Sequence, residues 1–128
     1  MKRESKEWFK KAEEDYKVVQ TQSLWSQKLY NIICFHGHQY IEKCLKAILF
    51  ENNIQVEKTH DLELLYHKCK HLIPEIEKYK KELIYLTQFS VRIRYPGFSV
   101  SSVHAKKTKQ IVDKMRKIFE SYFKKNKT

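Results

Sequence analysis

Apolar residues recur along this chain every three or four positions, which is the spacing of one face of an α-helix. The first stripe predicts a helix over residues 5–22, with Ser5 as a candidate cap and residues 21–23 leading into a connection. A broader stripe predicts a second helix over residues 26–52. Because apolar positions cover so much of its circumference, we expect this helix to be central in a bundle or to form a dimer contact.

The middle of the chain predicts two further helices. A short one over residues 61–71 has Thr59 or Asp61 as its cap. The next begins at a proline suited to a first helical turn and covers residues 74–94. We expect it to end before Pro96, because the residue preceding a proline is biased away from helical geometry.

The last helix follows residues 99–102, with Ser101 or Ser102 as its cap. No segment alternates with the period of a β-strand, and only two glycines and two prolines interrupt the chain. Short links favour antiparallel neighbours. The pattern therefore predicts an all-α fold, an up-and-down antiparallel bundle of four long helices plus one short helix, in a single domain spanning residues 1–128.

The composition of the chain indicates its net charge and its cellular location. The chain has 26 Lys and Arg against 15 Asp and Glu, a net charge of +11. This favours nucleic acid or an acidic protein as a partner, and a solvated, lysine-rich surface is the alternative. No apolar run approaches a membrane span, and no apolar stretch of a secretory signal follows the N-terminus. We therefore expect a cytoplasmic protein without a membrane partner.

Three cysteines, an odd number, argue against a disulfide framework, and we expect them to be reduced and buried. Gly37 in the second helix costs about 1 kcal/mol relative to Ala, which predicts close approach of a neighbouring helix. His67 and His71 share a helical face, but no third ligand is evident, so no metal is expected. His36 and His38 lie about 200° apart on the second helix and cannot share a site.

The best functional lead is the helix break at residues 91–97, which carries Arg92, Arg94 and Tyr95. Arginine offers a planar, always-charged fork that suits phosphate or carboxylate. This segment is therefore a candidate nucleotide or anion site. In the alternative, Arg94 pairs with an acid of the first helix, Asp15 or Glu14, and Tyr95 and Pro96 pack as a plug.

The start of the last helix adds further candidates. Lys106 and Lys107 lie there, and the helix N-terminus supplies free N–H groups. His104 lies in the first turn. With Arg94 stabilising the charge, His104 could transfer a proton in RNA cleavage, which makes these two residues the catalytic candidates.

Three sequence blocks, taken in order, resemble the HEPN family, the small helical domains found beside minimal nucleotidyltransferases. The first block is Trp8–Asp15, which contains Ala-x-x-Asp. The second is Phe35–Ala47, which contains Gln-x-x-Glu-Lys-x-Leu-Lys-Ala and is followed by Lys58–Leu62. The third is Arg94–Pro96, which is followed by the final amphipathic helix.

The resemblance implies a four-to-five-helix bundle, usually a homodimer, with a role in nucleotide or RNA transactions. It implies a minimal nucleotidyltransferase partner in a toxin–antitoxin-type pair and no cofactor. Many members are metal-independent ribonucleases with an Arg-x(4–6)-His motif. Here nine residues separate Arg94 from His104, and no arginine has a histidine at that spacing. A binding module is thus favoured, and a ribonuclease using Arg94 and His104 or a structural adaptor without ligand are the alternatives.

Overall fold

The computed structural model describes residues 1–25, 28–56 and 58–126, and every regular element in these ranges is helical. The α-helices are α1 (Arg3–Leu24), α2 (Tyr30–Glu51), α3 (Leu62–Cys69), α4 (Lys80–Thr87) and α5 (Ser102–Lys125). Two 3₁₀ segments, η1 (Pro74–Tyr79) and η2 (Arg92–Arg94), flank α4. The predicted all-α class is confirmed.

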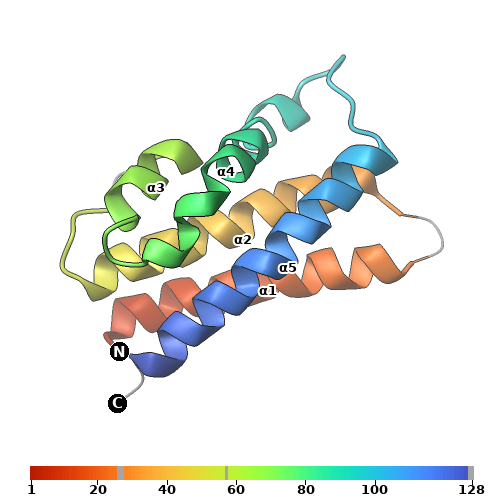
Figure 1. Cartoon of the computed structure of the whole chain (residues 1–128). Helices are drawn as coiled ribbons and strands as arrows, with labels where there is room; N and C mark the ends of the chain where they lie inside the picture. Colours follow the sequence, from red (N-terminus) through yellow and green to blue (C-terminus); the bar gives the residue numbers. More distant parts are fainter. Residues whose placement is uncertain (26–27, 57, 127–128) are drawn as a thin grey trace.

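The three long helices set the architecture. In Figure 1, α1 and α2 lie side by side, α5 crosses in front of them, and both chain ends lie at the same end of the molecule. The short helices α3 and α4 pack on the other flank of α2. Helix α2 is central, because 13 of its 22 residues are buried. No described helix has the length and apolar character needed to cross a bilayer.

Gly37 lies on the face of α2 that packs closely against α5. A Cβ atom at this position would lie 2.4 Å from Thr108 Cγ2 and 3.2 Å from Val112 Cγ2. The expected reason for a glycine within this helix is confirmed. The three cysteines, Cys34, Cys44 and Cys69, are buried and unbridged, also as expected.

The first two helices differ from prediction at their ends. Helix α1 begins at Arg3 after Lys2, so Ser5 is not its cap but a buried residue within its first turns. Residues 21–23 are helical and not a connection. Helix α2 begins at Tyr30, and residues 26–27 of its predicted start lie outside the described ranges.

The largest correction concerns the fourth helix. It was expected to continue to about Arg94, but α4 ends at Thr87 and has only eight residues. At this end of α4, side-chain hydroxyls compete with backbone N–H groups for the backbone carbonyls. Thr87 Oγ1 donates to the Leu83 carbonyl, and Ser90 Oγ donates to the Thr87 carbonyl. The described ranges thus contain three α-helices of 22 to 24 residues and two of eight, not four long helices plus one short helix.

Two predicted caps are present. Asp61 precedes α3 and accepts hydrogen bonds from the backbone N–H groups of Glu63 and Leu64. Ser101 precedes α5 in a capping box with His104. These caps fix where α3 and α5 begin, and the second one sets the exit of the loop that carries the arginines.

Candidate functional site

The loop between α4 and α5 presents its two arginines and one tyrosine to solvent. Arg92 and Arg94 lie in η2, whose last turn is closed by a 3.0 Å hydrogen bond from the Tyr95 N–H to the Arg92 carbonyl. Gly97 turns the chain back with φ +90°, a conformation that favours glycine. All three predicted side chains, Arg92, Arg94 and Tyr95, are exposed, and Tyr95 retains 61% of its accessible surface.

Each guanidinium group of this loop lies near an aromatic ring. Arg94 Cζ is 5.5 Å from the ring centroid of Phe35 on α2, and Arg92 Cζ is 5.8 Å from that of Phe98. A guanidinium that contacts a ring with one face keeps its N–H donors available at its edge. The geometry thus ties the arginines to the body of the molecule and leaves them able to bind an anion.

The alternative prediction, that Arg94 pairs with an acid of the first helix while Tyr95 and Pro96 pack as a plug, is wrong. Asp15 pairs with His36 and Lys43, and in the described part of the chain neither Asp15 nor Glu14 forms an ion pair with Arg94. Tyr95 and Pro96 are exposed and plug no cavity.

The predicted residues at the start of α5 do not form one cluster with the loop. Lys107 Nζ lies 4.1 Å from the ring centroid of Tyr85 on α4. Lys106 instead lines a groove toward the α1–α2 end together with Lys28 and Lys109. The two neighbouring lysines therefore face different helices.

His104 has a structural partner. Its Nδ1 accepts a 3.0 Å hydrogen bond from the backbone N–H of Ser101, which is the reciprocal half of the capping box. Its ring meets Phe89 edge to face, with centroids 6.0 Å apart. One ring nitrogen is thus engaged in starting α5.

Sequence reasoning missed a carboxylate cluster between α1 and α2. Asp15 retains only 6% of its surface, and both of its oxygens are engaged. Oδ1 lies 2.7 Å from His36 Nδ1, and Oδ2 accepts a 2.6 Å hydrogen bond from Lys43 Nζ. This cluster joins the two helices next to Phe35, the residue against which Arg94 lies.

A second cluster, centred on Glu42, was missed as well. Glu42 Oε2 accepts from Lys46 Nζ at 2.9 Å, and Oε1 lies 2.8 Å from His60 Nδ1. His38 Nε2 meets the His60 carbonyl at 2.8 Å, while its Nδ1 has no hydrogen-bond partner among the described residues. Burial lowers the pKa of His38. The cluster fastens the segment before α3 onto α2.

The sequence did carry a signal for both clusters. Asp15, Glu42 and Lys43 are among the charged residues of the blocks that resemble a known family, and they interrupt helices whose inner faces are otherwise largely apolar. Charged residues are rarely buried unless they are paired. Their pairing was thus foreseeable, but their partners were not, because a helical period does not specify which faces meet.

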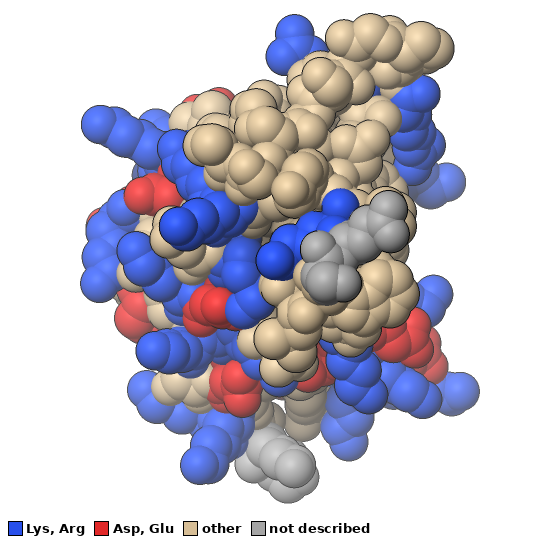
Figure 2. Space-filling view, turned by 90° about the vertical axis from the view of Figure 1, so that its right-hand side faces the viewer, with Lys and Arg blue, Asp and Glu red and all other residues tan. Residues whose placement is uncertain are grey.

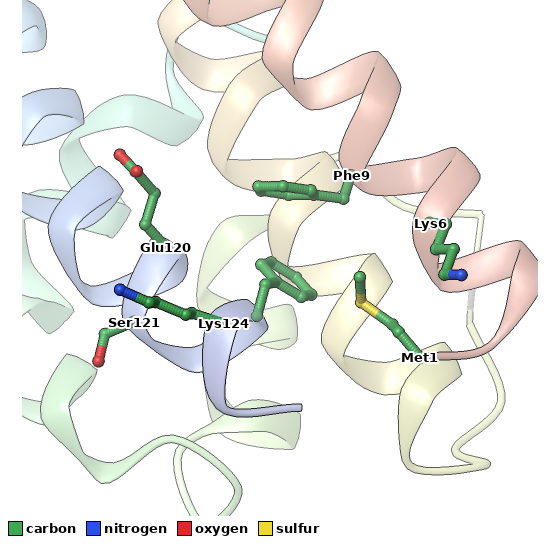
Figure 3. A pocket seen from close by; sticks show the side chains of 7 residues that line it. Met1, Lys6, Phe9, Glu120, Ser121 and Lys124 are labelled. Carbon is green, nitrogen blue, oxygen red and sulfur yellow. The ribbon is translucent and has the colours of Figure 1, made fainter. Parts of the chain in front are cut away.

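A hollow lies at the opposite end of the molecule, between the two chain ends (Figure 3). Phe9 and Phe123 pack together in its wall, with ring centroids 4.3 Å apart. Lys6, Glu120 and Lys124 also line it. None of the residues predicted to bind or react lies there.

Comparison with known families matches residues 5–126 to the model of the HEPN domain. No curated protein matches the chain, and no solved structure does. The family match covers nearly the whole chain, including the loop and both charged clusters.

Proposed function

This chain belongs to the HEPN domain family, which is generally a nucleotide- or RNA-binding module, and we propose that it binds nucleotide or RNA phosphate through Arg92 and Arg94. We further propose that it acts as a homodimer and as the partner of a minimal nucleotidyltransferase in a toxin–antitoxin-type pair. The observation that carries the binding role is the pair of exposed guanidinium groups held against aromatic rings.

The surroundings of the loop support an anionic ligand. In the described residues neither arginine has a carboxylate within ion-pair distance, so a phosphate would not have to displace a partner. Tyr95 adds an exposed ring on which a base can stack. The net charge of +11 attracts a polyanion over a longer range.

Exposed apolar side chains at the same end of the molecule support a protein contact. They occur in or directly beside the α1–α2 connection and the segment between α4 and α5: Leu24, Trp25, Leu29, Val91 and Val103. Figure 2 views this end, and uncharged atoms occupy much of its upper and central surface. Clustered exposed apolar surface marks interaction sites, which suits a dimer or a nucleotidyltransferase partner.

Binding is favoured over cleavage because His104 Nδ1 accepts the Ser101 N–H, which places the ring proton on Nε2, so that neither nitrogen can take up a further proton while the cap is formed. A general acid–base needs a ring nitrogen within reach of the reacting oxygen. The sequence spacing of Arg94 and His104 also departs from the ribonuclease motif of the family.

Replacement of Arg94 by Ala tests the binding role. We expect the variant to bind a fluorescein-labelled RNA ten- to hundredfold more weakly, since a charged hydrogen bond contributes about 1.5–3 kcal/mol. Arg94→Lys keeps the charge but loses the fork, and an intermediate affinity is expected. Fluorescence anisotropy measures both.

Arg3→Ala is the matched control, because Arg3 is exposed and its one ion pair among the described residues is with Glu7 on the same helix, at 3.4 Å. It removes the same charge far from the loop. If Arg94→Ala binds like the parent protein across the salt range, the loop is not the binding site.

The neighbouring gene tests the partner role. An adjacent small nucleotidyltransferase whose product co-purifies with this chain is the expected result. A co-expressed neighbour that elutes separately would argue against the pair.

A further inference from the structure

Charge is distributed unevenly over the long helices. Helix α5 carries eight Lys and Arg and only two Asp and Glu, whereas α1, of similar length, carries five of each. A lysine-rich composition alone would raise the charge of both helices. The excess on α5 is therefore a local property of this helix.

Four of these lysines form one exposed stripe, here termed the α5 lysine ridge: Lys106, Lys114, Lys117 and Lys124. With the exposed Gln110 and Ser121 they recur every three to four positions, so they lie on one helical face. At 1.5 Å per residue the ridge extends about 27 Å.

The acidic residues of α5 do not neutralise the ridge. Asp113 accepts from Lys109, and Glu120 pairs with Arg116, which also binds Glu13. Within the described ranges no ridge lysine lies within ion-pair distance of a carboxylate. In Figure 2 the side of the molecule on which α5 lies, at the left, carries many Lys and Arg side chains, with Asp and Glu side chains between them.

We infer that the α5 lysine ridge binds the sugar-phosphate backbone of a nucleic acid along α5, the helix that follows the arginine loop in the chain. Lysines are point charges that suit phosphates in succession, and such contacts are independent of sequence. The inference rests on the proposed function, because it extends the same ligand from the loop onto α5.

An acidic protein fits the ridge less well. Protein interfaces are depleted of Lys and depend on a buried apolar or aromatic centre. Among the described residues of α5, Val103 is the single large apolar side chain that is exposed, and it lies in the first turn next to the loop. The ridge itself offers charge without such a centre.

Neighbouring charges set the direction of the track. Glu75 and Glu77 line the same groove as Lys114 and Lys117, on its η1 side. They would repel phosphates that crossed from α5 onto η1. At the other end, Lys106 and Lys109 of α5 line a groove together with Lys28 of the α1–α2 connection, and none of the described residues that line it is acidic. A nucleic acid is therefore expected to run along α5 toward the arginine loop.

The test compares two triple variants of equal charge. Lys114→Gln/Lys117→Gln/Lys124→Gln neutralises three ridge lysines, and Lys10→Gln/Lys11→Gln/Lys17→Gln neutralises three exposed lysines of α1. Each is titrated with a labelled single-stranded RNA of about 20 nucleotides between about 50 and 200 mM salt. All six positions are exposed, so both variants should fold, which circular dichroism checks.

The ridge variant should bind about tenfold or more weakly, and the slope of log K against log salt should become shallower by about 2, since each single-strand phosphate contact contributes about 0.7. The α1 variant should keep the slope of the parent. Equal losses in the two variants, no loss in the ridge variant, or a parent that binds no RNA at low salt would each overturn the inference.

Arg94→Ala separates this inference from the proposed function. If Arg94→Ala weakens RNA binding while the ridge variant does not, the loop binds RNA and the inference about the α5 lysine ridge is wrong. If the ridge variant weakens binding while Arg94→Ala does not, the ridge binds and the loop assignment fails.

Discussion

At the residue scale, a glycine allows two long helices, α2 and α5, to pack closely against each other. Gly37 on α2 faces Thr108 and Val112 on α5, and a methyl group there would overlap Thr108 Cγ2 at 2.4 Å. Thr108 is itself fully buried and donates from Oγ1 to Cys34 Sγ at 3.5 Å, so it has little freedom to move away. The glycine is therefore a packing requirement.

Gly37→Ala should destabilise the protein although alanine favours helix. Overpacking costs about 1–3 kcal/mol, which exceeds the gain of about 1 kcal/mol in helix propensity when the neighbours cannot shift. Urea unfolding measures the difference in unfolding free energy.

Thr108→Ser provides the matched partner, because it removes the methyl group that the new side chain would overlap most closely, Thr108 Cγ2 at 2.4 Å. We expect the double variant Gly37→Ala/Thr108→Ser to be more stable than Gly37→Ala. A Gly37→Ala protein as stable as the parent would show that the two helices can separate at little cost.

At the element scale, side-chain hydrogen bonds decide where helices begin and end. Residues 74–94 have a continuous apolar stripe, yet α4 ends at Thr87 because Thr87 and Ser90 bond to backbone carbonyls of its last turn. Helix α5 begins sharply at Ser102 because Ser101 and His104 satisfy each other's backbone groups.

The capping role of His104 can be separated from a catalytic one. His104→Ala should lower the unfolding free energy by about 0.5–2 kcal/mol, the usual cost of losing a cap interaction, whereas His104→Gln should recover most of it. Glutamine can accept the Ser101 N–H but cannot transfer a proton near neutral pH.

Thermal unfolding and an RNA cleavage assay on the same three proteins decide between the roles. Metal-independent cleavage by the parent that is absent from His104→Gln would contradict a purely capping function. If His104→Ala is as stable as the parent, His104 does not stabilise the protein as a cap of α5.

At the scale of the whole molecule, buried charged clusters join elements that the sequence separates. Asp15 links α1 to α2, and the Glu42 cluster links α2 to the segment before α3. His38 lies within the second cluster, fully buried, near Glu42, Lys46 and His60. The protonation of one buried ring thus affects the stability of the whole fold.

Burial lowers the pKa of His38 below its ordinary value of 6.5. The unfolded chain therefore binds a proton more readily than the folded one in this range. The contribution of His38 to stability is complete above about pH 6.5 and is lost as the pH falls toward its folded pKa. We expect His38→Gln to show a smaller loss of unfolding free energy between about pH 7 and about pH 5 than the parent does.

His67→Gln serves as the control for this prediction, because His67 lies on the exposed face of α3, with 43% of its side chain accessible. It should retain the pH dependence of the parent. A His38→Gln variant with the same pH dependence as the parent would place the titrating group elsewhere.

The sequence predicted the helical class, the central position of α2, the caps Asp61 and Ser101, and the reason for Gly37. Apolar periodicity and capping residues are local signals, and these features depend on local signals. It did not predict that α4 ends at Thr87, that Asp15 pairs with His36, or that Lys106 and Lys107 face different helices. Those features depend on how helices are rotated against one another, which no local pattern contains.

The three buried cysteines have a practical consequence. Alkylating reagents attack the thiolate, and burial raises the pKa of all three thiols, that of Cys69 to about 12. In the folded protein these thiols are both shielded and protonated, while unfolding exposes them near their ordinary pKa. The rate of alkylation by iodoacetamide therefore reports the fraction of molecules that have opened. Because Cys34 faces α5 while Cys69 lies on α3, labelling resolved by residue would show whether the two ends of the bundle open together.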